Sequence, residues 1–399
     1  MDNTAGPVLC NSMTCTGCGA CSNACPVNAV KLLPDQKDGF YRPTIDYDRC
    51  VKCMKCEKSC PVISPVLPYE ESDAVYAVWN KDAEIRRNSS SGGAFSALAQ
   101  AVLDEGGIVI GAAYTENLHL KHVAIDRTED LELLRASKYV QSETGLIFRE
   151  AIRHLQLGRK VLFCGTPCQV TGFKAFLGAK SYENLLLVDF ICHGVPSPFF
   201  FQSYLKWLSR KYGRISNFRF RDKKRGWYDA LRVAMTDVQH YMKGKDDCYW
   251  VAYNNNNNLQ EVCYGCKFLG TKRNSDITIS DFWSIGKRIP FGHKKEISKG
   301  VSMVMVNTPS GAKIFEQAKK HIDYQQRALE EVILGNQAIL RSSLRPKNRS
   351  TFYVDLGTME FEDFLNKYLI PDKKTQLVKI FREYMPTFIV KFIRSIQQK

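Results

Sequence analysis

The sequence lacks any long hydrophobic run, and none of its apolar stretches approaches the ~18 residues that a membrane-spanning helix needs. Its first residues, Met1 to Thr4, lack both the basic segment and the apolar segment of a secretory signal peptide. Both absences argue against an integral membrane protein and against secretion. We therefore expect a cytoplasmic protein.

Cysteine, by contrast, is abundant, with 15 residues in a chain of 399. A chain this long is expected to fold as two or three units, so its cysteines do not resemble the disulfide framework of a small secreted domain. The hydrophobic content of 44% and the charged content of 24% are those of an ordinary globular protein. The cysteines therefore indicate metal or redox chemistry in a reducing compartment.

Eight of these cysteines form an internal repeat. Two runs have the spacing C-x2-C-x2-C-x3-C, each run is followed by proline, and the second follows the first at a constant offset. In such runs three thiolates hold three corners of a four-iron cluster, and the fourth thiolate reaches the neighbouring cluster. A zinc site would leave the third cysteine of each run idle. The repeat predicts two [4Fe-4S] clusters, one held by Cys15, Cys18, Cys21 and Cys60 and the other by Cys50, Cys53, Cys56 and Cys25.

The segment resembles bacterial two-cluster ferredoxins over about residues 8 to 66, and we expect residues 1–66 to be a ferredoxin domain. Cys10 lies outside the repeat and is expected to be structural. Prolines around the end of the domain mark residues 67–73 as a short, stiff linker.

The residues that follow alternate between strand patterns and helix patterns, which favours an α/β domain with much parallel pairing. Later strands are spaced less regularly, so we expect a mixed sheet. The predicted fold is a small two-cluster ferredoxin domain followed by a larger α/β domain with a mixed sheet. Strands are expected at 74–79, 107–114, 160–163, 185–191, 215–221, 230–235, 276–280 and 302–306, and helices at 94–103, 143–155, 167–177 and 198–210.

The loop from Asn88 to Phe95 is rich in serine and glycine and opens a predicted helix. Free backbone amides at a helix N-terminus can cradle a phosphate. A serine N-cap followed by a glycine loop explains the same residues equally well. The segment is neither a Walker A loop nor a G-x-G-x-x-G fingerprint.

Four more cysteines occupy positions where ligands are common. Cys168 and Cys192 each follow a predicted strand, and functional groups gather at the carboxyl ends of strands in α/β sheets. Cys263 and Cys266 form a C-x2-C pair. From spacing alone, the four could hold a third cluster, the pair could hold zinc, or the cysteines could be unrelated.

Several segments, in order, resemble the family of coenzyme F420 hydrogenase/dehydrogenase beta subunits. The resemblance runs from about Ala74 to Phe315, and many members carry a ferredoxin repeat in front. Two serines, Ser280 and Ser284, stand where the family usually has glycines. The matching segments are SSGGAF at 90–95, SKYV at 137–140, GTPCQ at 165–169, CHGVPSP at 192–198, the Cys263/Cys266 pair and SDIT-x-x-DFW at 275–283.

The resemblance implies a flavin and iron–sulfur domain over residues 74–345, in which FAD exchanges hydride with the deazaflavin coenzyme F420 and passes single electrons to a cluster. Lys138 and His193 are the candidate catalytic residues, which could stabilise negative charge on reduced flavin. A surface lysine and a loop histidine are the alternatives. The implied ligands of a third [4Fe-4S] cluster are Cys168, Cys192, Cys263 and Cys266, and the implied flavin-binding residues are Ser90, Ser91, Gly92, Gly93, Lys138, Tyr139, Gly165 and Thr166.

Basic residues concentrate in two stretches, Lys206–Arg225 and Lys373–Lys399. Each is either a solvated face or a docking surface for an anionic partner such as an acidic carrier protein. Residues 346–399 are expected to be a basic amphipathic region, and Leu377–Ile396 within it either packs on protein or makes peripheral membrane contact. The run Asn254–Asn258 is expected to be an exposed turn. No nucleic-acid recognition motif accompanies the charge.

Together these features predict an iron–sulfur flavoprotein oxidoreductase. It would pass electrons between a hydride carrier (coenzyme F420 or a similar molecule) and ferredoxin-type clusters via FAD. Its partners would be a redox protein or a small hydride carrier. The alternatives are a non-catalytic electron-transfer adaptor that uses only the ferredoxin clusters, and a basic iron–sulfur protein that binds nucleic acid.

Overall fold

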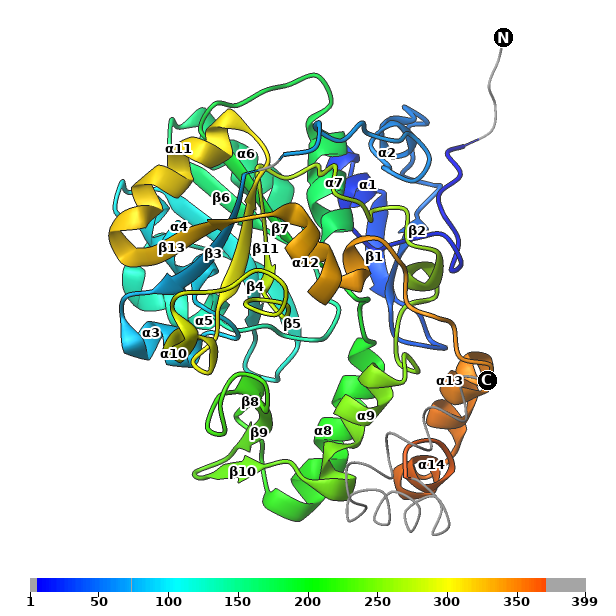
Figure 1. Ribbon diagram of the computed structural model, residues 1–399. Helices are drawn as coiled ribbons and strands as arrows, with labels where there is room; N and C mark the ends of the chain where they lie inside the picture. The colour runs from blue at the N-terminus through cyan, green and yellow to red at the C-terminus, as the bar shows by residue number, and fades with distance from the viewer. Residues whose placement is uncertain (1–5, 73, 371–399) are drawn as a thin grey trace, which may run out of the picture.

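The computed structural model describes residues 6–72 and 74–370 of the chain. Residues 6–72 form a small domain with two short helices, α1 (Ala20–Ala24) and α2 (Lys55–Lys58). Its strands β1 (Val30–Pro34) and β2 (Tyr41–Ile45) pair antiparallel. Figure 1 shows this domain packed beside helix α7 (Pro167–Leu177) of the larger domain, with α2 on its outer side. The predicted ferredoxin-like domain is confirmed.

An eight-stranded mixed sheet forms the centre of the larger domain, in the order β13-β3-β12-β11-β7-β6-β4-β5. The central strands β4, β6, β7 and β11 pair parallel, whereas every pairing outside this group is antiparallel. The predicted mixed sheet is confirmed. Its strands are β3 (Val75–Asn80), β4 (Ile108–Tyr114), β5 (Leu120–Ile125), β6 (Val161–Cys164), β7 (Leu185–Phe190), β11 (Ile277–Asp281), β12 (Ser302–Val306) and β13 (Ile322–Arg327).

Helices cover both faces of this sheet. Because successive side chains of a strand point to opposite faces, Leu162 of β6 packs with α4 (Ala94–Leu103) and α11 (Pro309–Ala318). The next residue, Phe163, packs with α6 (Ile147–Gln156) and α7 (Pro167–Leu177). Burying such a side chain contributes roughly 1.5–3 kcal/mol. The loops that follow β6 and β7 are therefore held on a rigid frame.

A second lobe with an aromatic core lies below the sheet in the view of Figure 1. Its strands β8 (Asn217–Asp222), β9 (Leu231–Met235) and β10 (Gln239–Tyr241) form a separate three-stranded sheet. The expectation that the strands at 215–221 and 230–235 belong to the mixed sheet is therefore wrong. These two strands pair with each other, and Phe218 and Phe220 on β8 pack onto the aromatic cluster of this lobe. The helices of the lobe are α8 (Pro198–Tyr212), α9 (Cys248–Asn254), α13 (Arg349–Thr358) and α14 (Phe361–Tyr368).

Short elements complete the described chain. The remaining α-helices are α3 (Ala83–Asn88), α5 (Leu131–Leu134), α10 (Lys294–Ile297) and α12 (Leu329–Gly335). The 3-10 turns are η1 (Thr128–Asp130), η2 (Gly244–Asp247), η3 (Glu261–Gly265), η4 (Lys319–His321) and η5 (Gln337–Ile339).

The asparagine run is not an exposed turn throughout, because Asn257 is 4% exposed and Asn258 is fully buried. The Asn258 carbonyl accepts a hydrogen bond from the Tyr353 hydroxyl at 2.8 Å, which ties this turn to α13. Within residues 6–72 and 74–370, no helix is long and apolar enough to cross a membrane. The predicted amphipathic stretch Leu377–Ile396 lies outside the described residues.

Candidate redox site

The first set of ferredoxin cysteines lines one small cavity. Cys15, Cys18, Cys21 and Cys60, which were predicted to hold one cluster, all contribute to its wall. Gly17 and Gly19 have positive φ angles of 67° and 89°, and this conformation lets the chain coil between the first three cysteines. Cys10 lines the same cavity, with its Sγ 3.7 Å from the Sγ of Cys60.

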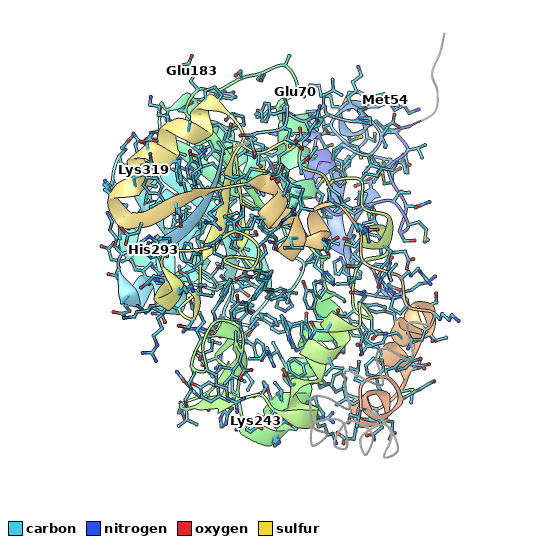
Figure 2. The ribbon with its side chains drawn as sticks, in the orientation of Figure 1. Met54, Glu70, Glu183, Lys243, His293 and Lys319 are labelled. Atoms are coloured by element: carbon cyan, nitrogen blue, oxygen red, sulfur yellow. The ribbon has the colours of Figure 1, made fainter. Side chains whose placement is uncertain are left out.

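Three members of the second set lie together beside it. Cys25, Cys50 and Cys56 belong to one apolar cluster that also includes Cys21 of the first set. The fourth member, Cys53, is exposed, unlike the other fourteen cysteines of the chain, all of which lie in the described residues. Met54 is labelled at the outer edge of the molecule in Figure 2. This second set is therefore the one nearest to solvent.

The four cysteines of the large domain line a single cavity between the two domains. Cys168 lies in the first turn of α7, Cys192 follows β7, and Cys263 and Cys266 lie in and after η3. Thr166 caps α7 through a capping box with Gln169, and the hydroxyl of Thr166 lies 3.1 Å from the Sγ of Cys168. The side chains brought together in this way are the predicted ligands of the third cluster.

Burial sets the chemistry of these thiols. It raises the pKa of Cys168 and Cys192 well above the usual range and raises that of Cys263 to about 12. The thiolates that a metal centre requires are thus unstable here without its positive charge. Within the described residues, no three His, Cys, Asp or Glu side chains are arranged to hold a single metal ion. Four cysteine sulfurs around one cavity are nevertheless the donors that a [4Fe-4S] cluster takes, so the chemistry of this donor set fits such a cluster.

A large cavity of about 590 Å³ adjoins the four-cysteine cavity. Cys192, His193, Gly194 and Val195 line both cavities. The volume is typical of small-molecule and cofactor sites. Of the predicted flavin and catalytic residues, the cavity wall contains Ser90, Ser91, Gly93, Lys138, Tyr139, Gly165, Thr166 and His193.

Gly92 is the exception, because it does not line the cavity. A Cβ at Gly92 would lie 2.2 Å from the carbonyl oxygen of Val78 and 2.6 Å from the backbone nitrogen of Ser302. Its amide donates to the hydroxyl of Ser302 at 2.9 Å. Gly92 therefore lets the loop pack closely on β3 and β12, and this contact places Ser90 and Ser91 in the wall.

Lys138 is enclosed in the wall of this cavity. Its Nζ donates to the carbonyl oxygens of Arg135 at 2.9 Å and Ala136 at 3.3 Å. Burial lowers the pKa of Lys138 to about 7, and the charge of Arg219 adds to this effect, whereas Cys164 opposes it. An anion in the cavity would favour the charged form of the lysine. The side chain therefore gains charge when a negative group binds.

His193 lies at the rim and is exposed. Its Nε2 is 2.7 Å from Oδ1 of Asn256, so the ring has a side-chain partner. The ring also makes an edge contact with Tyr253, at 5.2 Å between centroids. Tyr253 is itself part of the cavity wall.

Some cavity residues were not predicted as site residues, above all a buried Arg221 on β8. Burial alone would lower the pKa of Arg221, but the Asp281 carboxylate, 3.0 Å away, and the Tyr139 hydroxyl raise it. The guanidinium lies 5.0 Å from the ring centroid of Trp283. Asp281 and Trp283 belong to the SDIT-x-x-DFW segment, so a sequence motif did point to the two residues that contact Arg221. Arg221 itself was hidden in a stretch interpreted as a basic surface.

Six of the nine basic residues in that stretch are exposed, yet several of its charges have partners. Lys211 pairs with Asp246 at 2.6 Å and Arg214 with Glu116 at 3.5 Å. Lys206 is exposed on α8. The stretch Lys206–Arg225 is thus divided between a solvated face and, through Arg221, the wall of the cavity.

The ferredoxin domain packs closely against α7, where a glycine without a side chain allows the two to approach. A Cβ on Gly172 would lie 2.8 Å from the Sγ of Cys18 and 3.0 Å from its Cβ. Cys168, one turn earlier on α7, is close enough to Cys18 for its pKa to be raised by that thiol in addition to the larger effect of burial. Thr16 lines both the first ferredoxin cavity and the four-cysteine cavity. The cysteine sets of the two domains are therefore neighbours.

Polar contacts fix the same interface. Arg149 of α6 donates to the carbonyl oxygens of Asn23 at 2.6 Å, Ser22 at 3.2 Å and Cys25, and to Oδ1 of Asn28 at 2.7 Å. These carbonyls lie at or near the carboxyl end of α1, where a cation is favourable.

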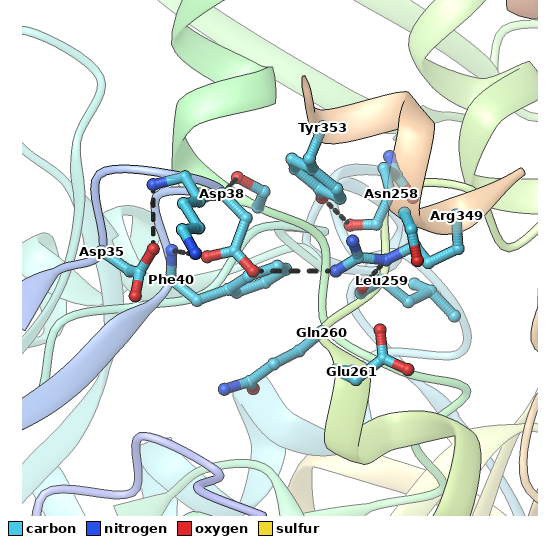
Figure 3. Close-up of polar contacts among 12 residues, drawn as sticks. Asp35, Asp38, Phe40, Asn258, Leu259, Gln260, Glu261, Arg349 and Tyr353 are labelled. Carbon is cyan, nitrogen blue, oxygen red and sulfur yellow. Dashed lines mark hydrogen bonds and ion pairs between the residues drawn. The ribbon is translucent and has the colours of Figure 1, made fainter. Parts of the chain in front are cut away.

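A second network joins the ferredoxin hairpin to residues 258–261, which lead into the C-x2-C pair (Figure 3). Asp38 accepts two hydrogen bonds from Arg42 and lies 3.8 Å from Arg349 of α13. Arg349 in turn donates to the carbonyl oxygen of Leu259 at 2.9 Å. Next to Leu259, Gln260 donates to the carbonyl oxygen of Cys15 at 2.9 Å. Both domains are thus fixed around the cysteines.

Models of known protein families match three regions of the chain. Residues 14–63 match the 4Fe-4S dicluster domain. Residues 75–147 match the N-terminal region, and residues 158–332 the C-terminal region, of the coenzyme F420 hydrogenase/dehydrogenase beta subunit.

Two individual proteins are similar to parts of the chain. A subunit of the F(420)H(2) dehydrogenase of Methanosarcina mazei is 25% identical over 186 residues, which cover 45% of this chain and 53% of that protein. The chain thus matches only about half the length of this curated relative. A chain in the structure of the F420-reducing [NiFe] hydrogenase complex from Methanosarcina barkeri is 20% identical, with a TM-score of 0.47 over 71% of this chain and 92% of that chain. From the matched regions, the chain belongs to the family of coenzyme F420 hydrogenase/dehydrogenase beta subunits and carries an N-terminal 4Fe-4S dicluster domain.

Proposed function

We propose that this protein is an iron–sulfur flavoprotein oxidoreductase that passes electrons between a hydride carrier and ferredoxin-type [4Fe-4S] clusters via FAD. The hydride carrier would be coenzyme F420 or a similar molecule, which is supported by the family and by the name of the similar dehydrogenase. When bound, FAD would exchange hydride with the carrier and release electrons singly to the clusters.

One observation carries the proposal, namely that three cavities adjoin. Thr16 lines both the first ferredoxin cavity and the four-cysteine cavity, and Cys192 lines both the four-cysteine cavity and the large cavity. A flavin in the large cavity would lie next to a cluster ligated by Cys168, Cys192, Cys263 and Cys266. That cluster would lie next to the one ligated by Cys15, Cys18, Cys21 and Cys60. The second ferredoxin cluster, near Cys53, would then face the solvent.

The large cavity offers suitable groups for both ends of FAD. Helix α4 begins in the cavity wall, so its free amides and its dipole favour an anion such as a diphosphate. Arg135, whose Nε donates to the Ser96 hydroxyl at 3.1 Å, lies in the same wall. Ser90 and Ser91 precede the helix and would complete this end. Lys138 and His193 would lie at the redox-active end.

Lys138 is proposed to stabilise negative charge on the reduced cofactor. Because burial lowers the pKa of Lys138 to about 7, its proton is easily lost in the absence of an anion and regained beside one. The enclosing residues Tyr139 and Tyr253 would exclude water from the same end. This chain's own contribution is thus to position the cofactor, exclude water and hold a proton at Nζ of Lys138.

The protein partner is proposed to be a one-electron carrier. An acidic carrier protein would find exposed cations on α8, such as Lys206. The proposed peripheral membrane contact rests on residues 377–396, which lie outside the described residues.

The test is an anaerobic reduction assay in which reduced coenzyme F420, a reduced nicotinamide and a reduced ferredoxin are compared in parallel. Protein isolated without oxygen should show flavin absorbance and about twelve irons per chain, four for each cluster. Reduced coenzyme F420 should bleach the flavin first and the clusters afterwards. About eight irons without flavin would instead identify a non-catalytic adaptor that uses only the ferredoxin clusters.

A further inference from the structure

A ninth cysteine lies beside the two ferredoxin runs. Cys10 precedes the first run and has no place in the repeat. In the structure its side chain is half-buried and lines the cavity of the first cysteine set. Its Sγ lies 3.7 Å from the Sγ of Cys60, within hydrogen-bonding distance for sulfur. Five thiols thus line a cavity whose cluster needs four ligands.

The chain holds Cys10 in this position from both sides. Before it, the carbonyl oxygen of Pro7 accepts a hydrogen bond from the Tyr47 hydroxyl at 3.1 Å, and the amide of Val8 donates to a carboxylate oxygen of Glu57. After it, a turn returns the chain to the cluster loop, with the amide of Cys15 donating to the carbonyl oxygen of Asn11 at 2.9 Å. The contact between Cys10 and Cys60 is therefore part of the fold of the domain.

Cys60 is the ligand of its set that is farthest away in the sequence. The other three cysteines of the set, Cys15, Cys18 and Cys21, share one tight loop, whereas Cys60 comes from the end of the second run, after α2. Its position depends on the loop around α2, whose residues Lys55 and Lys58 are exposed. A cluster would lose this ligand more readily than the three in the loop.

We propose that Cys10 is a reserve ligand of the first ferredoxin cluster, placed to donate a hydrogen bond to the Cys60 sulfur and to replace it on the same iron. In the exchange, the iron–sulfur bond to Cys60 breaks and one to Cys10 forms, while the proton of Cys10 passes to Cys60. No electron enters or leaves, and no further reactant is needed. While Cys60 is the ligand, the Cys10 hydrogen bond raises the reduction potential of the cluster, because it offsets the extra negative charge of the reduced state.

The test is to replace Cys60 alone, and then Cys60 together with Cys10, and to measure the iron content of the full-length protein isolated without oxygen. Cys60→Ala should keep the iron content of the unmodified protein. The double variant Cys10→Ala/Cys60→Ala should lose about four irons, one cluster's share. The matched control is Cys21→Ala, which should lose the same amount, because Cys10 lies against the sulfur of Cys60 and is placed to replace that ligand alone. Loss of about four irons in Cys60→Ala alone, with the other clusters still visible by electron paramagnetic resonance, would overturn the proposal.

If Cys60→Ala does not fold, the proposal is tested instead on the iron content and the reduction potential of Cys10→Ala. Cys10→Ala keeps every ligand of the repeat, so its iron content should be unchanged. Its first ferredoxin cluster should titrate at a more negative potential in electron paramagnetic resonance. An unchanged potential would contradict the hydrogen bond. Both measurements concern only the ferredoxin clusters, so their outcome is independent of whether FAD or coenzyme F420 binds.

Discussion

The substitution Gly172→Ala tests whether the ferredoxin domain is fixed against α7. The new methyl group would lie 2.8 Å from the Sγ of Cys18 and 3.0 Å from its Cβ, closer than packed atoms allow. Overpacking of this kind costs about 1–3 kcal/mol. In the opposite direction, alanine is preferred over glycine within a helix by about 0.5–1 kcal/mol.

The matched control is Gly357→Ala in α13. Gly357 is also helical, but a Cβ there would meet nothing within 4 Å. Since the helix preference is common to both variants, their difference isolates the contact with Cys18. Gly172→Ala should be less stable than Gly357→Ala by about 1–3 kcal/mol in anaerobic denaturant unfolding.

The same variant should separate two steps of electron transfer. Stopped-flow reduction of Gly172→Ala by the hydride donor should bleach the flavin at the unmodified rate, because Gly172 is not part of the large cavity. Reduction of the ferredoxin clusters should be slower, because α1 must move away from α7. If Gly172→Ala is as stable as Gly357→Ala and reduces the ferredoxin clusters as fast as the unmodified protein, the close contact does not exist.

Three further changes test other parts of the site. Cys168→Ser should remove about a third of the iron, one cluster of three, and an unchanged iron content would rule out Cys168 as a ligand. Lys138 has a pKa of about 7 in the folded protein against 10.5 unperturbed, so at pH 7–9 the unfolded chain binds a proton that the folded chain has lost. The stability of the flavin-free protein should therefore rise with pH in this range, and Lys138→Met should flatten the rise; an equal slope in the variant would refute the lowered pKa. Arg149→Met should cost about 1.5–3 kcal/mol for each strong charge-assisted hydrogen bond lost and should speed amide exchange in α1. Unchanged exchange would show that Arg149 does not hold the domains together.

The sequence predicted those parts of the protein that depend on local spacing. The cysteine runs predicted that Cys60 joins the loop of Cys15, Cys18 and Cys21, and these four thiols line one cavity. The helix Ala94–Leu103 and the helix Pro167–Leu177 have the predicted bounds, since a glycine loop or a proline marks each start.

Long-range pairing was harder to predict. Strand β13 adds to the sheet edge next to β3, more than 240 residues earlier in the chain, and its polar sequence gives no strand signal. Arg221 was missed because charge patterning cannot distinguish an exposed arginine from one paired with Asp281 inside a cavity. Cys10 was set aside for a similar reason, since its contact with Cys60 spans 50 residues and follows no motif.

The contacts between the domains have a functional consequence. Arg149, Gln260 and Arg349 fix the ferredoxin domain at several points, so it is held as part of the larger unit in the described residues. A fixed domain keeps its own cysteines beside the four-cysteine cavity, but it cannot swing toward a partner. An electron carrier would have to approach the exposed side near Cys53.

The most direct test of the account is anomalous X-ray diffraction at the iron absorption edge from crystals grown without oxygen. We expect three four-iron clusters, with the third enclosed by Cys168, Cys192, Cys263 and Cys266, and flavin density in the adjoining large cavity. Iron confined to the ferredoxin domain, with zinc or no metal among those four cysteines, would contradict the account.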